Sequence, residues 1–183
     1  SVTSPEGNHD RGSHYMLTGR RLTPLLSYPS FGSYLHLDGA GDDRVPPYIA
    51  IPDAHVYARQ GFLPAARAPF ELGSAPGRPD YRVRNLKPPP QLERAMRLLK
   101  AVDQLDGAPR SESEAARDAV LKQAGNHSLN PKLRELFDVS KEDSATQKRY
   151  GNGTIGQSCL LARRLVEGGC LLYTSPSPRD RYI

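Results

Sequence analysis

The chain has 183 residues, of which 37% are hydrophobic and 25% are charged, and its formal net charge at pH 7 is +5. This length fits one domain with its own core, and no apolar stretch approaches the roughly 20 residues that a membrane-spanning helix needs. Basic residues alternate with acids, as where Arg94, Arg97 and Lys100 lie near Glu93 and Asp103, and no basic stripe is interleaved with aromatic side chains. The composition therefore predicts a folded protein with no membrane span and no nucleic-acid partner.

The first half of the chain is rich in glycine and proline and predicts short elements joined by long loops. Residues 13–22 are expected to form a helix. The apolar run at 48–51 lies between prolines and predicts a short buried strand. Residues 53–90 are predicted to form a long ordered loop. His55 and Tyr57 are candidates to line a pocket there, although such residues more often only anchor a loop.

The second half predicts a series of helices that begins after a run of three prolines. Ser111 with Glu114 three residues later is typical of a capping box, and that helix is expected to end before Gly125. Asn130 followed by Pro131 is typical of a helix start. The expected helices cover residues 92–105, 111–124, 131–137, 140–150 and 154–167.

The last of these helices has apolar residues at helical spacing, which predicts its buried face. We assign Ile155, Cys159, Ala162 and Val166 to that face and leave its charged residues in water. A cysteine in such a stripe is more typical of a core residue than of a catalyst.

The densest group of polar residues is at 8–14, where His9, Asp10, Arg11, Ser13 and His14 occur together. Imidazole and carboxylate groups can bind a metal ion, and an arginine can hold an oxyanion. The alternative interpretation is a polar loop that leads into a helix. Two histidines five residues apart lack the i, i+4 spacing of helical metal ligands, and Ser13 has no evident activating base.

Six blocks of the sequence, in the same order along the chain, resemble one family. This is the bacterial sulfatase-like family known as domain of unknown function 1501, which we place in the alkaline-phosphatase-like superfamily. The blocks are NHDRGSHYMLTGRRLTPLLSYPSFGSYL, VPPYIAIPD, GFLPAARAPFELGS, YRVRNLKPP, LRELFDVSKE and RYGNGTIGQSCLLARRLVEGG. In members of the family, the helix ending in RRLVE is followed by a strand and a Gly-Gly-Trp-Asp-x-His segment. Neither is expected here.

The segment that follows that helix, CLLYTSPSPRD, is instead similar to the translation of an adaptor oligonucleotide used in sequencing. We therefore expect residues 1–169 to be a fragment of one sulfatase-like domain, truncated at both ends. Residues 170–183 are expected to be a tail that is not native to the protein.

The resemblance implies a partial α/β/α sandwich of alkaline-phosphatase-like type, with a helix-rich C-terminal half and long loops in the N-terminal half. Sulfatases carry a Cys-x-Pro-Ser-Arg signature that ends in Leu-Thr-Gly-Arg, and the residues at 17–20 match that end. The same spacing places His9 where the nucleophilic cysteine would be and Ser13 where the arginine would be. Sulfatase chemistry through that cysteine is therefore not supported.

For the complete protein the resemblance implies a hydrolase of phosphate or sulfate esters that depends on a divalent metal ion, whereas the fragment itself is expected to be inactive. His9 and Asp10 are then the candidate metal ligands, and Arg11 and His14 are the candidate catalytic residues, with Arg11 contacting the anion. The expected partners are an anionic ester or a polysaccharide, and the expected location is the periplasm or the cell surface. The competing hypothesis is an exported binding or scaffold protein that has a hydrolase fold but no catalytic activity.

Overall fold

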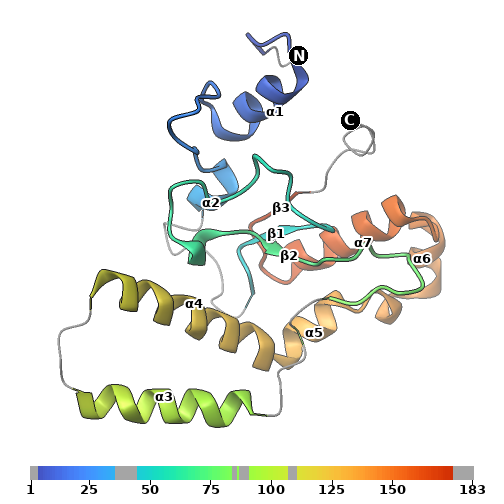
Figure 1. Cartoon of the computed structure of the whole chain (residues 1–183). Coiled ribbons are helices and arrows are strands. Elements are labelled where there is room, and N and C mark those ends of the chain that lie inside the picture. The colour runs from blue at the N-terminus through green and yellow to red at the C-terminus, as the bar shows by residue number, and fades with distance from the viewer. Residues whose placement is uncertain (1–3, 36–44, 84–85, 87–90, 107–110, 175–183) are drawn as a thin grey trace.

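The computed structural model describes residues 4–35, 45–83, 86, 91–106 and 111–174 as a mixed α/β structure (Figure 1). Its strands form one parallel sheet in the order β2-β1-β3. No helix among the described residues is long and apolar enough to cross a membrane. The strands are β1 (Tyr48–Ala50), β2 (Phe70–Glu71) and β3 (Leu172–Thr174). The helices are α1 (His9–Thr18), α2 (Phe31–Leu35), α3 (Leu92–Asp106), α4 (Glu112–Leu129), α5 (Pro131–Phe137), α6 (Ser144–Tyr150) and α7 (Thr154–Glu167), with short 3-10 turns η1 (Ala65–Arg67) and η2 (Val139–Lys141).

The central strand β1 is buried on both faces, as its apolar sequence predicts. Successive side chains of a strand point to opposite faces. Ile49 joins the main core, whereas the ring of Tyr48 packs against α2 at Gly32, where a Cβ atom would lie 2.6 Å from that ring. The Tyr48 hydroxyl also donates a hydrogen bond to the carbonyl of Ala58, at 2.9 Å. The predicted strand is therefore confirmed, and it anchors the long loop that follows it.

The main core lies between the sheet and the pair α5 and α7. Its fully buried side chains include Ile49, Leu72, Leu133, Leu161 and Leu165. Helix α5 begins where the sequence predicts, since the Asn130 side chain accepts a hydrogen bond from the N–H of Lys132. Helix α7 also has its predicted bounds.

The buried face of α7 differs from the predicted one. Ile155, Cys159 and Val166 are exposed, and Ala162 alone of the four predicted residues is buried. Successive helix residues are about 100° apart, so three buried leucines lie on the side of α7 away from the predicted stripe, and their burial removes more apolar surface from water. The leucines are Leu160, Leu161 and Leu165.

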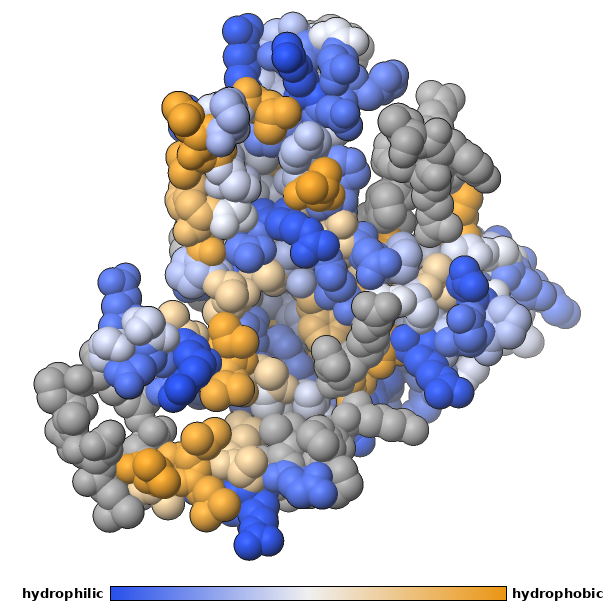
Figure 2. All heavy atoms as spheres, viewed as in Figure 1, coloured by the Kyte–Doolittle hydropathy of each residue, from blue (hydrophilic) through white to orange (hydrophobic). Residues whose placement is uncertain are grey.

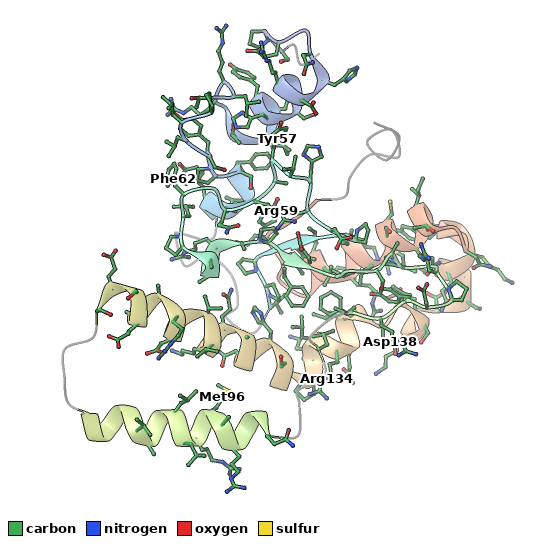
Figure 3. The ribbon with its side chains drawn as sticks, in the orientation of Figure 1. Tyr57, Arg59, Phe62, Met96, Arg134 and Asp138 are labelled. Atoms are coloured by element: carbon green, nitrogen blue, oxygen red, sulfur yellow. The ribbon has the colours of Figure 1, made fainter. Side chains whose placement is uncertain are left out.

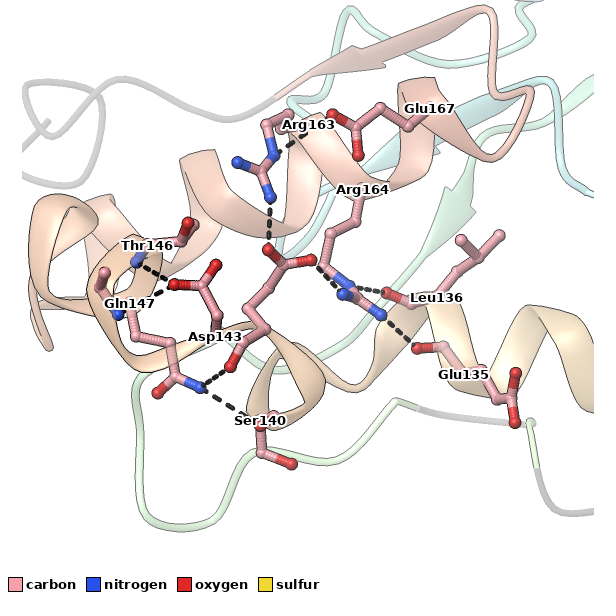
Figure 4. A network of polar contacts seen from close by, with 11 residues as sticks. Glu135, Leu136, Ser140, Asp143, Thr146, Gln147, Arg163, Arg164 and Glu167 are labelled. Atoms are coloured by element: carbon pink, nitrogen blue, oxygen red, sulfur yellow. Dashed lines mark hydrogen bonds and ion pairs between the residues drawn. The ribbon is translucent and has the colours of Figure 1, made fainter.

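A network of ion pairs fixes α7 to the segment before α6 (Figure 4). The carboxylate of Glu142 accepts from Arg163, at 2.5 Å, and from Arg164. Its hydrogen bond to Arg163 holds the pKa of that guanidinium above its usual value. Arg164 also donates to the carbonyls of Leu136, at 3.0 Å, and Glu135, at 2.7 Å. One arginine thus satisfies carbonyls at the C-terminal end of α5.

Three of the predicted helices have wrong boundaries. Helix α1 begins at His9 instead of residue 13 and ends at Gly19, whose positive φ of 68° reverses the chain. Helix α4 continues through Gly125 because Met96 of α3 packs on the space that this glycine leaves open. Helix α6 is capped by Asp143, and Ser140 belongs to η2.

The structure also contains a strand after α7, where the sequence analysis expected none. Leu171 donates its N–H to the carbonyl of Pro47, and Cys170 is buried beside the same residue. A continuous apolar run in the sequence after Gly169 and the positive φ of that glycine, 101°, favour this extension of the sheet. The strand lies in the segment predicted to be a non-native tail, and that origin stays a prediction.

Candidate functional site

The polar residues predicted as a site form the first turns of α1. The side chain of Asn8 accepts hydrogen bonds from the N–H groups of Asp10, at 2.9 Å, and Arg11, at 3.2 Å. An asparagine at this position satisfies N–H groups that have no partner within the helix. The side chains of His9, Asp10 and Arg11 are exposed, and only His14 is buried.

His14 is held in one orientation by the end of its own helix. Its Nδ1 lies 2.9 Å from the carbonyl oxygen of Arg20. Because a carbonyl oxygen only accepts, Nδ1 carries the proton, and Nε2 is the acceptor nitrogen of the neutral ring. Thr18 supports this turn, since its hydroxyl donates to the carbonyl of His14 at 2.7 Å.

Aromatic rings surround this imidazole. Tyr57 meets it edge-on at 5.1 Å between centroids, and Tyr28 does so at 6.4 Å. The Arg20 guanidinium lies 6.0 Å from the centre of the Tyr28 ring, within the range of a cation–π contact. His14 is only 3% exposed in this setting, so it faces low-dielectric surroundings and one cavity.

That cavity has a volume of about 170 Å³ and lies between α1, the loop at 22–28 and the loop after β1. His14, Tyr28, Tyr57 and Arg59 line it, so of the two candidate pocket residues Tyr57 lies at this cavity. Figure 3 shows Tyr57 and Arg59 on the same loop, above the sheet. His55 instead stacks near Tyr57, with 5.4 Å between the ring centroids.

The loop that carries Arg59 is tied to the sheet. Glu71, the last residue of β2, accepts from Arg59 at 2.8 Å and from the N–H of Ala54 at 3.2 Å. The carboxyl end of β2 thus fixes the loop that leaves the carboxyl end of β1. Sequence reasoning missed Arg59, because its partner is reached only when the two strands pair.

A second cavity, of about 420 Å³, lies at the carboxyl ends of β1 and β2, the edge where open α/β sheets bind ligands. Asp53, Ser74, Arg78 and Asp80 line it. Arg78 donates a hydrogen bond to Asp80 at 3.1 Å, which lowers the pKa of that carboxyl below its usual value. Ser74 is no free nucleophile, since its hydroxyl donates to the carbonyl of Arg82 at 2.8 Å and accepts from the N–H of Arg82.

None of the residues of this second cavity was predicted as a site residue from the sequence. Asp53 follows the predicted strand by two residues, and that position beyond a buried parallel strand was a usable signal. Arg78 and Asp80 lie in a loop without periodicity, and no local pattern marks them.

The structure does not gather the predicted metal ligands into a metal centre. Among the residues that it describes, no group of three or more His, Cys, Asp or Glu side chains is placed to hold a metal ion. Asp10 and His14 lie one helical turn apart, at i and i+4. The metal roles of His9 and Asp10 and the catalytic roles of Arg11 and His14 stay predictions.

The family model described as "Protein of unknown function (DUF1501)" matches residues 1–172 of the chain. No curated protein and no solved structure matches it.

Proposed function

The chain belongs to the family described as "Protein of unknown function (DUF1501)", and we propose that it forms part of a hydrolase of phosphate or sulfate esters. The proposal places the protein in the alkaline-phosphatase-like superfamily and at the periplasm or cell surface. It takes residues 1–169 as part of one sulfatase-like α/β/α domain that acts on an anionic ester.

The observation that carries this proposal is the setting of His14. A buried imidazole donates through Nδ1 to a backbone carbonyl and keeps Nε2 as an acceptor. A general base needs a positioned lone pair of this kind, and a carbonyl partner fixes both the tautomer and the ring orientation. In the proposed reaction, Nε2 of His14 accepts a proton from water as the water oxygen bonds to the phosphorus or sulfur atom. The bond to the ester oxygen breaks, and the leaving alcohol takes up a proton from His14 or from solvent water.

Arg59 supplies the charge that such a reaction needs. Its guanidinium lines the same cavity as His14 and is half exposed, and it is positioned by Glu71. An arginine can hold the oxygens of a phosphate or sulfate group through two parallel hydrogen bonds. Arg11, predicted to contact the anion, lies on the exposed first turn of α1, one turn before His14.

A divalent metal ion fits the described residues poorly. His9 and Asp10 are exposed neighbours on α1, and the structure describes no third acidic, histidine or cysteine side chain placed to complete a site with them. We therefore derive no step through a metal ion. The predicted metal requirement is tested separately, by the metal content of the natural protein with His9→Ala.

The test of the proposal is hydrolysis of p-nitrophenyl phosphate and p-nitrophenyl sulfate by the natural protein. We expect His14→Gln to lower kcat/KM by at least about 100-fold, the range typical of a lost general base. His55→Gln is the matched control, because His55 is a half-buried histidine that also has its ring near Tyr57 but does not line the cavity. The control should stay within about threefold of the parent.

Full activity in a folded His14→Gln protein would refute the role of His14. Activity in neither the parent nor the variants, at any metal supplement, would refute ester hydrolysis.

The alternative is a non-catalytic protein that binds polysaccharide, and one observation favours it. Three aromatic side chains, Phe31, Tyr34 and Phe62, are each exposed by more than 40%. Phe62 also meets Tyr28 of the His14 cavity edge-on, at 6.3 Å. Exposed rings give sugars a flat apolar surface for stacking. Retention on immobilised polysaccharide that Phe62→Ala abolishes, in a protein without esterase activity, would favour this alternative.

A further inference from the structure

Two adjoining cavities lie between α4 and the segment around η1, and their lining does not include His14 or its partners. The outer cavity has a volume of about 390 Å³ and the inner one about 210 Å³. Gln123 and His127 line both, so the two form one groove. The volume of the outer cavity, and that of the pair together, lies within the range of small-molecule sites, about 300–1,000 Å³.

The outer part of the groove is cationic. Arg67 lines it from η1 and Lys122 from α4, and the amides of Gln123 and Asn126 add further polar groups. None of the described residues that line this cavity is an aspartate or a glutamate. An anionic group there would lie between two positive charges on opposite walls.

The inner part of the groove is apolar and partly aromatic. Its lining includes Tyr48, Phe70 and Val120. His127 lies where the two parts meet, only 6% exposed, with its ring edge-on to Phe70 at 6.0 Å. An apolar chain in this part would leave water for a largely hydrocarbon surface.

The groove exists because one face of α4 carries small side chains. Ala116 and Ala119 line its outer part and Ala124 its inner part. These alanines keep the helix stable without filling the space opposite η1. Figure 1 shows α4 running beneath the loop that carries η1.

We propose that this groove binds a small anionic amphiphile. Its single head group is a sulfate, a phosphate or a carboxylate that lies between Arg67 and Lys122, and its short alkyl or aryl body lies in the inner cavity. This site does not depend on the proposed ester hydrolysis, since the two cavities share no lining residue with the cavity of His14.

The first test uses octyl sulfate, inorganic sulfate and octyl glucoside as separate probes, with binding to the chain measured by calorimetry below the micellar concentration of each detergent. Octyl sulfate has both a charged head group and an alkyl tail. Inorganic sulfate lacks the tail, and octyl glucoside lacks the charge. We expect octyl sulfate to bind at least about tenfold more tightly than either. Equal binding of octyl glucoside would show that the head group is not recognised and would overturn the proposal.

Two substitutions then separate the head from the tail. Lys122→Gln should weaken octyl sulfate binding about fivefold, as expected for one exposed charge contact. Lys132→Gln, on α5 and outside the groove, is the matched control and should leave binding unchanged. Ala124→Leu keeps a helix-favouring residue but fills part of the inner cavity, so octyl sulfate should bind more than about tenfold more weakly while methyl sulfate binding is unaffected.

Each groove variant can also refute the role of its own residue. If Lys122→Gln or Ala124→Leu folds, binds octyl sulfate like the parent and keeps the same order of affinities for the probes, the role proposed for that residue is wrong. His14→Gln provides the last comparison. Octyl sulfate is itself a sulfate ester, and its binding to the groove should persist in that variant. Loss of binding in His14→Gln but not in Lys122→Gln would assign the ligand to the cavity of His14 and reject the groove.

Discussion

Two helical regions of this protein have similar sequence patterns but different surroundings. Helix α7 buries three leucines completely, and two of them, Leu161 and Leu165, belong to the core cluster shared with α5 and the sheet. Helix α3 has an equally regular apolar stripe, yet Leu98, Leu99 and Val102 are 58%, 45% and 59% exposed. Figure 2 shows apolar side chains gathered on the surface over α3. Helical periodicity therefore indicates which residues form a helix and leaves open whether another element covers its apolar face.

The difference has a visible structural cause. Helix α7 is held by the sheet, by α5 and α6, and by the paired arginines at Glu142. Helix α3 packs mainly on α4, through Met96 against Gly125 (Figure 3). A helix with a single neighbour can bury only a narrow strip of its surface. We define the covered region as β1, β2, α5 and α7, and the hairpin as α3 and α4.

The largest contrast in stability is expected when one leucine of each region is replaced by alanine. Leu161 is fully buried, and Leu161→Ala should lower the free energy of unfolding by about 2–5 kcal/mol, because it removes apolar contacts and leaves a cavity. Leu99→Ala is the matched control in the hairpin and should cost less than about 1 kcal/mol. Urea denaturation followed by circular dichroism measures both.

Similar losses for the two leucine variants would contradict the comparison. They would mean that Leu99 is covered in solution, and the oligomeric state of the chain would then have to be measured together with its stability.

A second contrast uses a helix glycine in each region. A Cβ atom at Gly156 would overlap the backbone carbonyl of Tyr150, at the end of α6, whereas one at Gly125 would meet only the flexible end of Met96. Gly156→Ala should therefore cost about 2–3 kcal/mol, a loss typical of overpacking against groups that cannot move. Gly125→Ala should change stability by less than about 1 kcal/mol, since improved helix propensity offsets the displaced methionine.

Thermal unfolding monitored at 222 nm measures this pair. A larger loss for Gly125→Ala than for Gly156→Ala would show that the close contact of α3 with α4 is the more rigid one.

The sequence could predict the fold where local chemistry decides it. The capping box at Ser111 and the asparagine cap at Asn130 gave correct helix starts. It failed at Gly125, because a glycine is typical of a helix end and only the contact with Met96 from another helix explains its place within α4. The predicted buried face of α7 is also wrong, because apolar residues occur on two sides of this helix and tertiary packing decides which side is covered.

The candidate site was predictable only in part, for a related reason. The residues from His9 to His14 stood out by composition, but their helical geometry leaves three of the predicted side chains exposed and turns His14 inward. Arg59 and Tyr28 come from loops far apart in the sequence, and they meet His14 only after β1 and β2 pair. No local pattern could have brought these three together.

The smallest expected effect concerns pH and again separates the covered region from the hairpin. The Tyr81 hydroxyl donates to the carbonyl of Phe137 at 3.3 Å, and burial, with a smaller contribution from Asp138, raises the pKa of Tyr81 well above its usual value. Above about pH 10, the ordinary pKa of tyrosine, the unfolded chain loses this proton and the folded chain keeps it. The contribution of protonated Tyr81 to the free energy of unfolding is fully present below about pH 10 and is lost as the pH rises. The loss amounts to about 1 kcal/mol at pH 11.

The control for this pH dependence is Tyr81→Phe, measured by urea midpoints at pH 9 and pH 11. The variant lacks the hydroxyl, so it should be slightly less stable than the parent at pH 9 and should lose less stability between the two pH values. The hairpin sequence contains no tyrosine, so the difference between parent and variant reports on Tyr81, which packs against the core of the covered region. An identical loss in both proteins would mean that Tyr81 ionises normally in the folded chain and that its surroundings admit water.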